Sequence, residues 1–380
     1  MKRNIFSSRP QKLSTMRFQS KKIRKRSWRR TVLLCFVAGS TLFVLNQLAS
    51  SSQESLKVEE KPQEVKPGGD FQGLKILDGN GKMLPSAKTL LTKPPPFSDA
   101  DVIKLSDTTI TTPNTIVTAY FRVPSKFKPG KYDAWMRNML SLQDAMVIFT
   151  HRDLVSQIKD FRSHALNRTV IVPLELDELP IGTLYSKDFW EEQLDKDPEK
   201  KIHRSYQLLW IWLSKTWCTT EAIRLNFFQS DLFVWSDIGC FRDSKYNSLT
   251  MIRHRENVPP NEMIQMAHHK PNPPKEVLWA NKYKEKQHYY HSGSQFAAYK
   301  DTWKIFHEKF LETIDKFLER DMFIGEDQHV LQSVCLQHPE LCAYIPFTMV
   351  KDNHYFGLRW VLHNDVKLNY WRQNKLQSSG

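Results

Sequence analysis

Residues 232–239, LFVWSDIG, decide how the rest of the chain is interpreted. The apolar run 232–235 predicts a buried strand, and Gly239 allows the backbone to turn sharply after it. Asp237 is thereby placed at the carboxyl end of the strand, where open α/β sheets bind their ligands. A carboxylate there can share a divalent cation with a diphosphate, because hard cations take oxygen ligands. The alternative is an aspartate that closes a turn and binds nothing.

Apolar runs and amphipathic stretches alternate on both sides of this segment. We predict strands over residues 116–120, 145–150, 169–173, 232–235 and 342–345, and helices over residues 132–142, 153–162, 205–214, 219–228, 303–317 and 328–336. This alternation is typical of the α/β class, with a mostly parallel sheet flanked by helices, in one domain over residues 113–372. Neither GxGxxG nor GxxxxGK[ST] occurs, so a dinucleotide-binding dehydrogenase and a P-loop NTPase are not supported.

The net charge of +14 is concentrated at the N-terminus. Residues 1–30 contain twelve Lys and Arg and no Asp or Glu, which leaves +2 for residues 31–380. The folded part is therefore close to neutral, and we expect no nucleic-acid partner for it. The basic tail by itself is also compatible with a nuclear-localisation or RNA-binding arm.

Residues 31–49, TVLLCFVAGSTLFVLNQLA, form an uncharged stretch long enough to cross a bilayer as a helix. The basic flank at residues 1–30 predicts a cytoplasmic tail and a type II orientation. A cleavable signal peptide is the alternative. We expect a Golgi membrane protein, with the endoplasmic reticulum as the second choice, because short anchors suit thinner membranes. Residues 50–112 are interpreted as a largely disordered stem and residues 373–380 as a C-terminal tail.

Cysteines and a sequon agree with a lumenal domain. Beyond Cys35 in the anchor, four cysteines remain at positions 218, 240, 335 and 342. Cys335 and Cys342 are the candidate disulfide by proximity, and four free thiols are the alternative. Asn167 begins an Asn-Arg-Thr sequon, a candidate glycosylation site.

Two groups of residues could carry chemistry together with Asp237. His354 is a second candidate ligand for Mn²⁺ or Mg²⁺, and Arg359 could bind phosphate. Asp327 is the candidate base for an acceptor hydroxyl, with Glu326 as its substitute. Acidic residues in a first helical turn are also favoured by the helix dipole without any catalytic role.

Residues 291–296, HSGSQF, are interpreted as a loop that precedes a helix. Small residues let a ligand approach the backbone, and free helix N–H groups can donate to sugar hydroxyls. Gly293, Ser294 and Gln295 are therefore candidates for sugar or acceptor contacts. An ordinary turn with a serine cap is the alternative.

Taken together, residues 114–370 resemble the WlaTC/HtrL (YibB-type) family of glycosyltransferases. The matching segments are residues 115–121, 146–150, 233–242 and 325–328. The resemblance implies a GT-A-like nucleotide-diphospho-sugar transferase fold in which Asp237 ligates a metal and Thr118 and Tyr120 face the nucleoside. Trp235 replaces the first acid of the Asp-x-Asp signature found in many such enzymes.

These observations together predict a membrane-anchored glycosyltransferase. It would move a sugar from a nucleotide-diphosphate donor, a UDP-sugar first, to a glycan, protein or lipid acceptor. A catalytically silent lectin-like or scaffold protein with the same fold is the alternative. A metal-dependent hydrolase would need more carboxylates or histidines in close array.

Overall fold

The computed structural model describes residues 76, 81, 83–107, 110–124, 127, 129–268 and 291–372. All of them belong to the compact unit formed by residues 71–380. Among these residues no helix combines the length and the apolar character needed to cross a membrane. The predicted anchor at 31–49 and the predicted tails at 1–30 and 373–380 lie outside the described residues.

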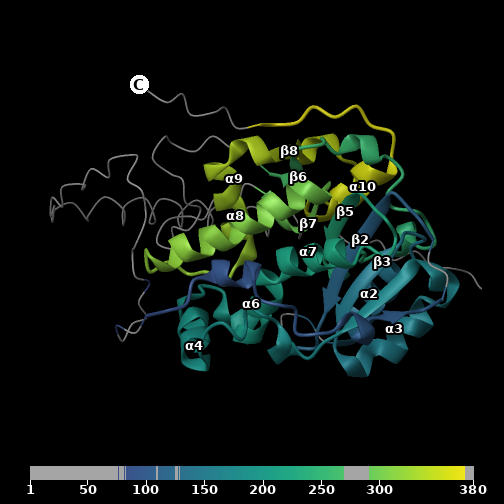
Figure 1. Ribbon diagram of the computed structural model, residues 1–380. Coiled ribbons are helices and arrows are strands. Elements are labelled where there is room, and N and C mark those ends of the chain that lie inside the picture. Colours follow the sequence, from purple (N-terminus) through teal and green to yellow (C-terminus); the bar gives the residue numbers. More distant parts are fainter. Residues whose placement is uncertain are drawn as a thin grey trace, which may run out of the picture. The chain divides into compact units, whose positions relative to one another are not determined.

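A mixed sheet forms the centre of this unit (Figure 1). In the described residues its eight strands lie in the order β1-β4-β3-β2-β5-β7-β6-β8. The strands are β1 (Ile103–Lys104), β2 (Asn114–Tyr120), β3 (Met146–Thr150), β4 (Thr169–Pro173), β5 (Leu232–Ser236), β6 (Met263–Ala267), β7 (His291–Tyr299) and β8 (Cys342–Pro346). Neighbours β4, β3, β2 and β5 are parallel, as are β6 and β8, whereas β7 runs antiparallel to both β5 and β6. The fold is thus of the predicted α/β class, with a mostly parallel sheet.

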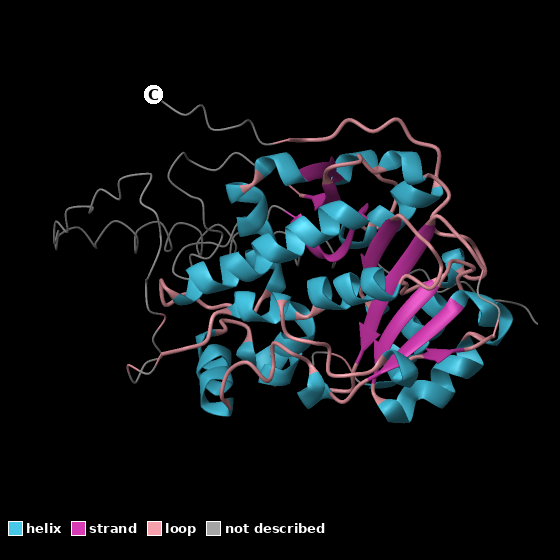
Figure 2. Cartoon of the chain, viewed as in Figure 1, coloured by secondary structure: helices cyan, strands magenta, loops and turns pink. Residues whose placement is uncertain are grey.

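Helices cover both faces of the sheet (Figure 2). They are α2 (Pro129–Leu140), α3 (Val155–Phe161), α4 (Lys187–Lys196), α5 (Lys200–His203), α6 (Tyr206–Leu213), α7 (Lys215–Leu225), α8 (Lys300–Leu318), α9 (Asp327–Gln337) and α10 (Leu358–His363). One core joins α6, α7, α8 and α9 to Val117 and Ala119 of β2. The other core joins α2, α3 and α10 to Ile116 and Tyr120 of the same strand. Alternate residues of a buried strand therefore serve two layers of helices.

Helix α8 shows how the sequence pattern produces this packing. Trp303, Phe306, Phe310, Ile314 and Phe317 recur three or four residues apart and are all buried. Each such side chain contributes about 1.5–3 kcal/mol when it leaves water. The apolar stripe holds α8 against the sheet and beside α7 (Figure 1).

The prediction for residues 291–296 was wrong, because they open the nine-residue strand β7. The strand lies between β5 and β6 in the middle of the sheet, and most of its residues are buried. Its Ser, Gly and Ala side chains lack the β-branched or aromatic character that marks a strand. Pairing with two neighbours fixes the conformation instead.

The domain also begins earlier than residue 113, within the segment that we interpreted as stem. A short 3₁₀ helix, η1 (Ala87–Leu91), buries Ala87 and Leu90. The Ser86 hydroxyl and the Ala87 N–H both donate to the Asp315 carboxylate in α8. Strand β1 then pairs with β4 and forms one edge of the sheet. Residues 83–107 are thus folded against the sheet and its helices.

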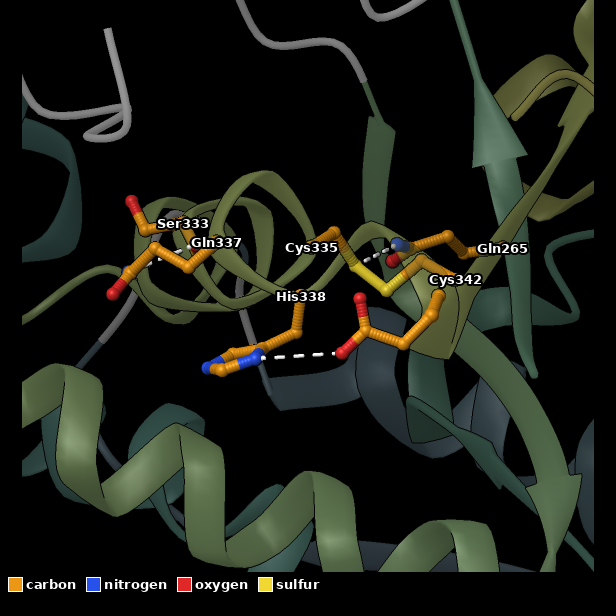
Figure 3. Close-up of a disulfide and its surroundings, with 7 residues drawn as sticks. Gln265, Ser333, Cys335, Gln337, His338 and Cys342 are labelled. Atoms are coloured by element: carbon orange, nitrogen blue, oxygen red, sulfur yellow. Dashed lines mark hydrogen bonds and ion pairs between the residues drawn. A yellow bond between two sulfur atoms is a disulfide. The ribbon is translucent and has the colours of Figure 1, made fainter. Parts of the chain in front are cut away.

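Cys335 in α9 and Cys342 at the start of β8 are joined by a disulfide (Figure 3). The Gln265 side-chain amide of β6 donates to the Cys335 sulfur at 3.2 Å. The bond ties α9 to the sheet edge formed by β6 and β8. Cys218 and Cys240 are buried free thiols.

Candidate functional site

The strand order creates a switch point between β2 and β5. From β2 the chain adds β3 and β4 on one side, then returns to place β5 on the other side of β2. Open α/β sheets bind ligands outside the carboxyl ends of the strands at such a point. The topology therefore selects the ends of β2 and β5 as the place to look for a site.

A pocket of about 900 Å³, counting its open mouth, lies at these strand ends. Its walls come from the ends of β2 and β5, from α2 and from α6, and they are largely aromatic or apolar. The lining residues are Ala119, Tyr120, Phe121, Arg122, Val123, Phe127, Tyr132, Trp135, Leu208, Ile211, Trp212, Lys215, Trp235, Asp237, Ile238, Gly239, Arg242 and Phe356. An apolar pocket with a few charged groups is the usual form of a small-molecule site.

Asp237 is the acidic residue of this lining, and it follows β5 directly, as predicted. Its backbone N–H donates to the Ser294 carbonyl of β7 at 2.9 Å. The Trp235 indole N–H donates to its Oδ1 at 2.8 Å. The side chain remains 35% exposed. Asp237 is thus fixed by one hydrogen bond that it donates to β7 and one that it accepts from β5, and it still presents carboxylate surface to the pocket.

Lys215 is a candidate site residue that the sequence analysis missed. Its side chain is 4% exposed, and Nζ lies 3.0 Å from Asp237 Oδ1 and 2.7 Å from Asp327 Oδ2. It also donates to the Gly293 carbonyl at 2.9 Å. Burial acts to lower the pKa of this ammonium, but the two carboxylates outweigh burial and hold the pKa above its ordinary value. The sequence signal for this residue is that Lys215 is the one charged residue in the largely apolar stretch 206–218.

Asp327 lies behind Lys215 and is not part of the pocket lining. Its side chain is 8% exposed. Burial raises the pKa of Asp327 to about 6, although the attraction of Lys215 opposes the shift. A Cβ at Gly293 would lie 3.3 Å from Asp327 Oδ2, so glycine leaves room for this close approach. Glu326 occupies the N-cap position of α9, 3.5 Å from His329 Nδ1.

Arg359 does not have the phosphate-binding position that we expected. It is 1% exposed, and its guanidinium donates to both oxygens of Asp352, at 2.8 and 3.2 Å, and to the Cys240 carbonyl. Burial acts to raise the pKa of Asp352, yet hydrogen bonds from Arg359 and Lys245 bring it down to about 2. A phosphate could reach Arg359 only by breaking a buried ion pair. Its role is therefore to pack the loop after η6 (Ile238–Cys240) against the C-terminal segment.

The expected sugar contacts of Gly293, Ser294 and Gln295 are not supported, since none of the three lines the pocket. As part of β7 they offer no free helix N–H groups. Ser294 donates through its hydroxyl to the Tyr355 carbonyl, and the buried Gln295 amide donates to Ser236 Oγ at 2.9 Å. The three residues hold Lys215, Asp237 and the end of β5 in place.

The residues expected at the nucleoside divide into two groups. Tyr120 lines the pocket, with its ring centroid 5.9 Å from that of Tyr132. Thr118 is fully buried and lies outside the lining.

His354 is the second residue that we expected to bind a metal ion. Its backbone lies in the short helix η11 (His354–Phe356), which also contains the lining residue Phe356. The structure does not describe the His354 side chain.

The described part of the chain holds no cluster of three or more His, Cys, Asp or Glu residues arranged for a metal ion. The carboxylate of Asp237 nevertheless fits a divalent cation that binds together with a phosphate-containing substrate. A carboxylate has about four lone-pair sites, so the bonds from Lys215 and Trp235 leave acceptor capacity on Asp237. Magnesium-type ions are often held by one or two carboxylates, with substrate phosphates and waters as the other ligands.

Asn167 is exposed, whereas Thr169 of its sequon is buried at the start of β4. The Thr169 hydroxyl donates to the Ala165 carbonyl at 2.8 Å. The structure therefore leaves room for a glycan on Asn167 in the folded chain.

Comparisons with known proteins identify a family. The model of the HtrL_YibB family, described as a bacterial protein of unknown function, matches residues 113–355. A search of curated proteins finds no match. A solved structure of mouse xyloside xylosyltransferase 1, in its apo form, is similar at 10% identity with a TM-score of 0.33, and the alignment covers 60% of this chain and 83% of that one. Because the family match spans more than half of the 380 residues, the chain belongs to the HtrL_YibB family.

Proposed function

We propose that the domain is a glycosyltransferase that takes a sugar from a nucleotide-diphosphate donor, a UDP-sugar first. The observation that carries the proposal is the pocket at the β2–β5 switch point. Aromatic walls can stack on a base or a sugar ring. The half-exposed Asp237 and the buried ammonium of Lys215 supply polar groups at the same place.

Within this proposal, Asp237 faces the charged part of the donor. Lys215 holds the carboxylate in one orientation, so little rotational freedom is lost when a ligand binds. A divalent cation, Mn²⁺ or Mg²⁺, would offset the charge of the leaving diphosphate, with Asp237 and His354 as its proposed protein ligands.

Asp327 takes a different role from the base that the sequence suggested. A group that removes an acceptor proton must come within hydrogen-bond reach of it. Asp327 is buried, lies outside the described lining of the pocket and is ion-paired with the lining residue Lys215. We therefore propose Asp327 as a positioning residue for Lys215 and leave the acceptor side to the open mouth of the pocket.

For location we propose a single-pass type II protein of the Golgi membrane, with the endoplasmic reticulum as the alternative. The uncharged stretch 31–49 supports the anchor. The Cys335–Cys342 disulfide supports an oxidising compartment for the domain. A glycan on Asn167 provides the test. Endoglycosidase treatment of the expressed chain should increase its mobility, and Asn167→Gln should remove that effect; an unchanged mobility would argue against a lumenal domain.

Turnover provides the test of the enzyme proposal. Detergent-solubilised full-length chain is incubated with a panel of UDP-sugars and Mn²⁺, and UDP release is measured with and without candidate glycan acceptors. We expect release from one donor and its loss in Asp237→Asn, a variant of almost the same shape. No release from any nucleotide sugar, or equal release by Asp237→Asn, would contradict the proposal.

A catalytically silent protein that binds nucleotide or glycan is the second candidate. Two observations favour it. Lys215 already forms an ion pair with the Asp237 carboxylate, and the candidate base Asp327 lies outside the pocket lining. Saturable UDP binding without turnover of any UDP-sugar would select it.

A further inference from the structure

Arg242 is an exposed cation at the wall of the pocket. It follows η6 and Phe241, and it lines the same pocket as Asp237. Its guanidinium carbon lies 4.5 Å from the Trp135 ring centroid, 4.7 Å from that of Phe356 and 5.4 Å from that of Phe127. Three rings from separate parts of the chain therefore surround one guanidinium.

The donors of Arg242 are largely uncommitted to protein acceptors. The Nε–H donates to the Gly239 carbonyl at 3.3 Å, and no carboxylate of the described residues lies within ion-pair distance. Arg359 is the contrast, since it is buried and bound to Asp352 through two hydrogen bonds. A guanidinium carries five N–H donors, so most of those on Arg242 point to solvent or to a ligand.

Aromatic contacts prepare such a group for an anion. Stacking on ring faces restricts the long side chain before any ligand arrives, which reduces the entropy lost on binding. The rings also exclude water from one side of the guanidinium. A planar fork with two parallel N–H groups matches the oxygens of a phosphate.

The charge of the pocket has the sign that this role requires. Its lining contains the cationic residues Arg122, Lys215 and Arg242 and the acidic residue Asp237. Lys215 is paired with two buried or half-buried carboxylates and Arg122 forms a surface pair with Asp153, so Arg242 is the lining cation that has no carboxylate partner among the described residues.

We propose that Arg242 is the phosphate-binding residue of the pocket, held in a bidentate orientation by Phe127, Trp135 and Phe356. The ligand class is a diphosphate, free or as part of a nucleotide. This assignment rests on the proposed function for the nucleotide, while the anion itself is tested separately.

Isothermal titration calorimetry of the full-length chain in detergent tests the proposal. The probes are UDP, inorganic pyrophosphate and uridine, each titrated into wild type, Arg242→Gln and Arg242→Lys. The matched control is Arg137→Gln, because Arg137 is also exposed and stacked on a ring, that of Phe161, but lies outside the pocket. Melting curves of all variants verify that each is folded.

We expect Arg242→Gln to weaken UDP and pyrophosphate binding by about ten- to a hundredfold, the range of a lost charge-assisted hydrogen bond. Arg242→Lys should lie between wild type and Arg242→Gln, because it keeps the charge and loses the fork. Any binding of uridine, and all binding by Arg137→Gln, should be unchanged.

Different titration results would contradict the phosphate site at Arg242 and the proposed UDP-sugar donor. Equal UDP affinity of wild type and Arg242→Gln would overturn the role of Arg242 and leave the proposed function standing. Arg242-dependent binding of pyrophosphate without binding of UDP would support the anion site and contradict the UDP donor. Absence of binding of both UDP and pyrophosphate to wild type would overturn the anion site.

Discussion

Replacement of Lys215 by methionine should be strongly destabilising at neutral pH. The Lys215 side chain is 4% exposed and lies between Asp237 and Asp327. Methionine fills a similar volume, so the cavity contribution is small. The main effect is electrostatic, because two carboxylates then face each other without a cation. Removal of one partner from a buried ion pair costs about 3–5 kcal/mol.

The loss should depend on pH in a way that identifies its cause. Burial already raises the pKa of Asp327 to about 6, and removal of the ammonium would raise the pKa further. At pH 5 Asp327 can take up a proton and remove one of the two facing charges. We therefore expect a smaller loss at pH 5 than at pH 7.5. The double variant Lys215→Met/Asp327→Asn should recover much of the stability at pH 7.5.

Urea unfolding followed by tryptophan fluorescence, supported by melting curves, measures these differences. A loss of this size corresponds to a decrease of the melting temperature of the order of 10 °C. Lys300→Met is the control, since Lys300 forms a surface pair with Asp231 at 2.8 Å and should change the stability little. A Lys215→Met chain within about 1 kcal/mol of wild type, with no dependence on pH, would refute the reasoning from the buried charge cluster.

Three further outcomes are expected. Because the folded-state pKa of Asp327 lies above its ordinary value, the contribution of this group to stability should fall as the pH rises from about 4 to about 6, and urea titrations of Asp327→Asn should lack that component. Arg359→Met should lower the free energy of unfolding by about 3 kcal/mol, since it removes the buried guanidinium from Asp352 and leaves that carboxylate with Lys245 and the Tyr246 hydroxyl; a stable variant with weakened UDP binding would instead favour a phosphate role. Reduction of the Cys335–Cys342 bond, or Cys335→Ser with Cys342→Ser, should cost about 2 kcal/mol for so short a loop, and an unchanged melting temperature under reducing agent would contradict this.

The parallel half of the sheet could be predicted from the sequence because its strands are continuous apolar runs. Val117, Val147, Val170 and Val234 lie in strands buried on both faces, and such strands show no polar alternation. The position of Asp237 followed from the same pattern, since the run ends two residues before it. Local sequence was sufficient wherever burial was signalled by the strand's own residues.

Strand β7 could not be predicted in this way. Its residues 292–295, SGSQ, have the composition of a turn, and β5 and β6 supply the hydrogen bonds that make them a strand. The position of Lys215 in the site could not be predicted either, because its two carboxylate partners lie 22 and 112 residues further along the chain. Contacts of that range are created by the fold alone.

Arg242 and Arg359 show the same limit for charged residues. Both lie near aromatic residues in the sequence, and Arg359, five residues after His354, was the one that we predicted to bind phosphate. The fold gives Arg359 a buried carboxylate partner in Asp352 and leaves Arg242 exposed in the pocket. The sequence shows which side chains are cationic, whereas the tertiary partner decides which one can meet a ligand.

The central claim is that the pocket at the β2–β5 switch point binds a nucleotide diphosphate against Asp237. A calorimetric titration of the full-length chain with UDP in Mn²⁺ tests it most directly. We predict saturable one-site binding that is lost in Asp237→Ala and retained in Asp243→Ala, a nearby exposed acid outside the pocket lining. UDP binding of the same affinity in both variants, or no binding to the wild-type chain, would contradict the account.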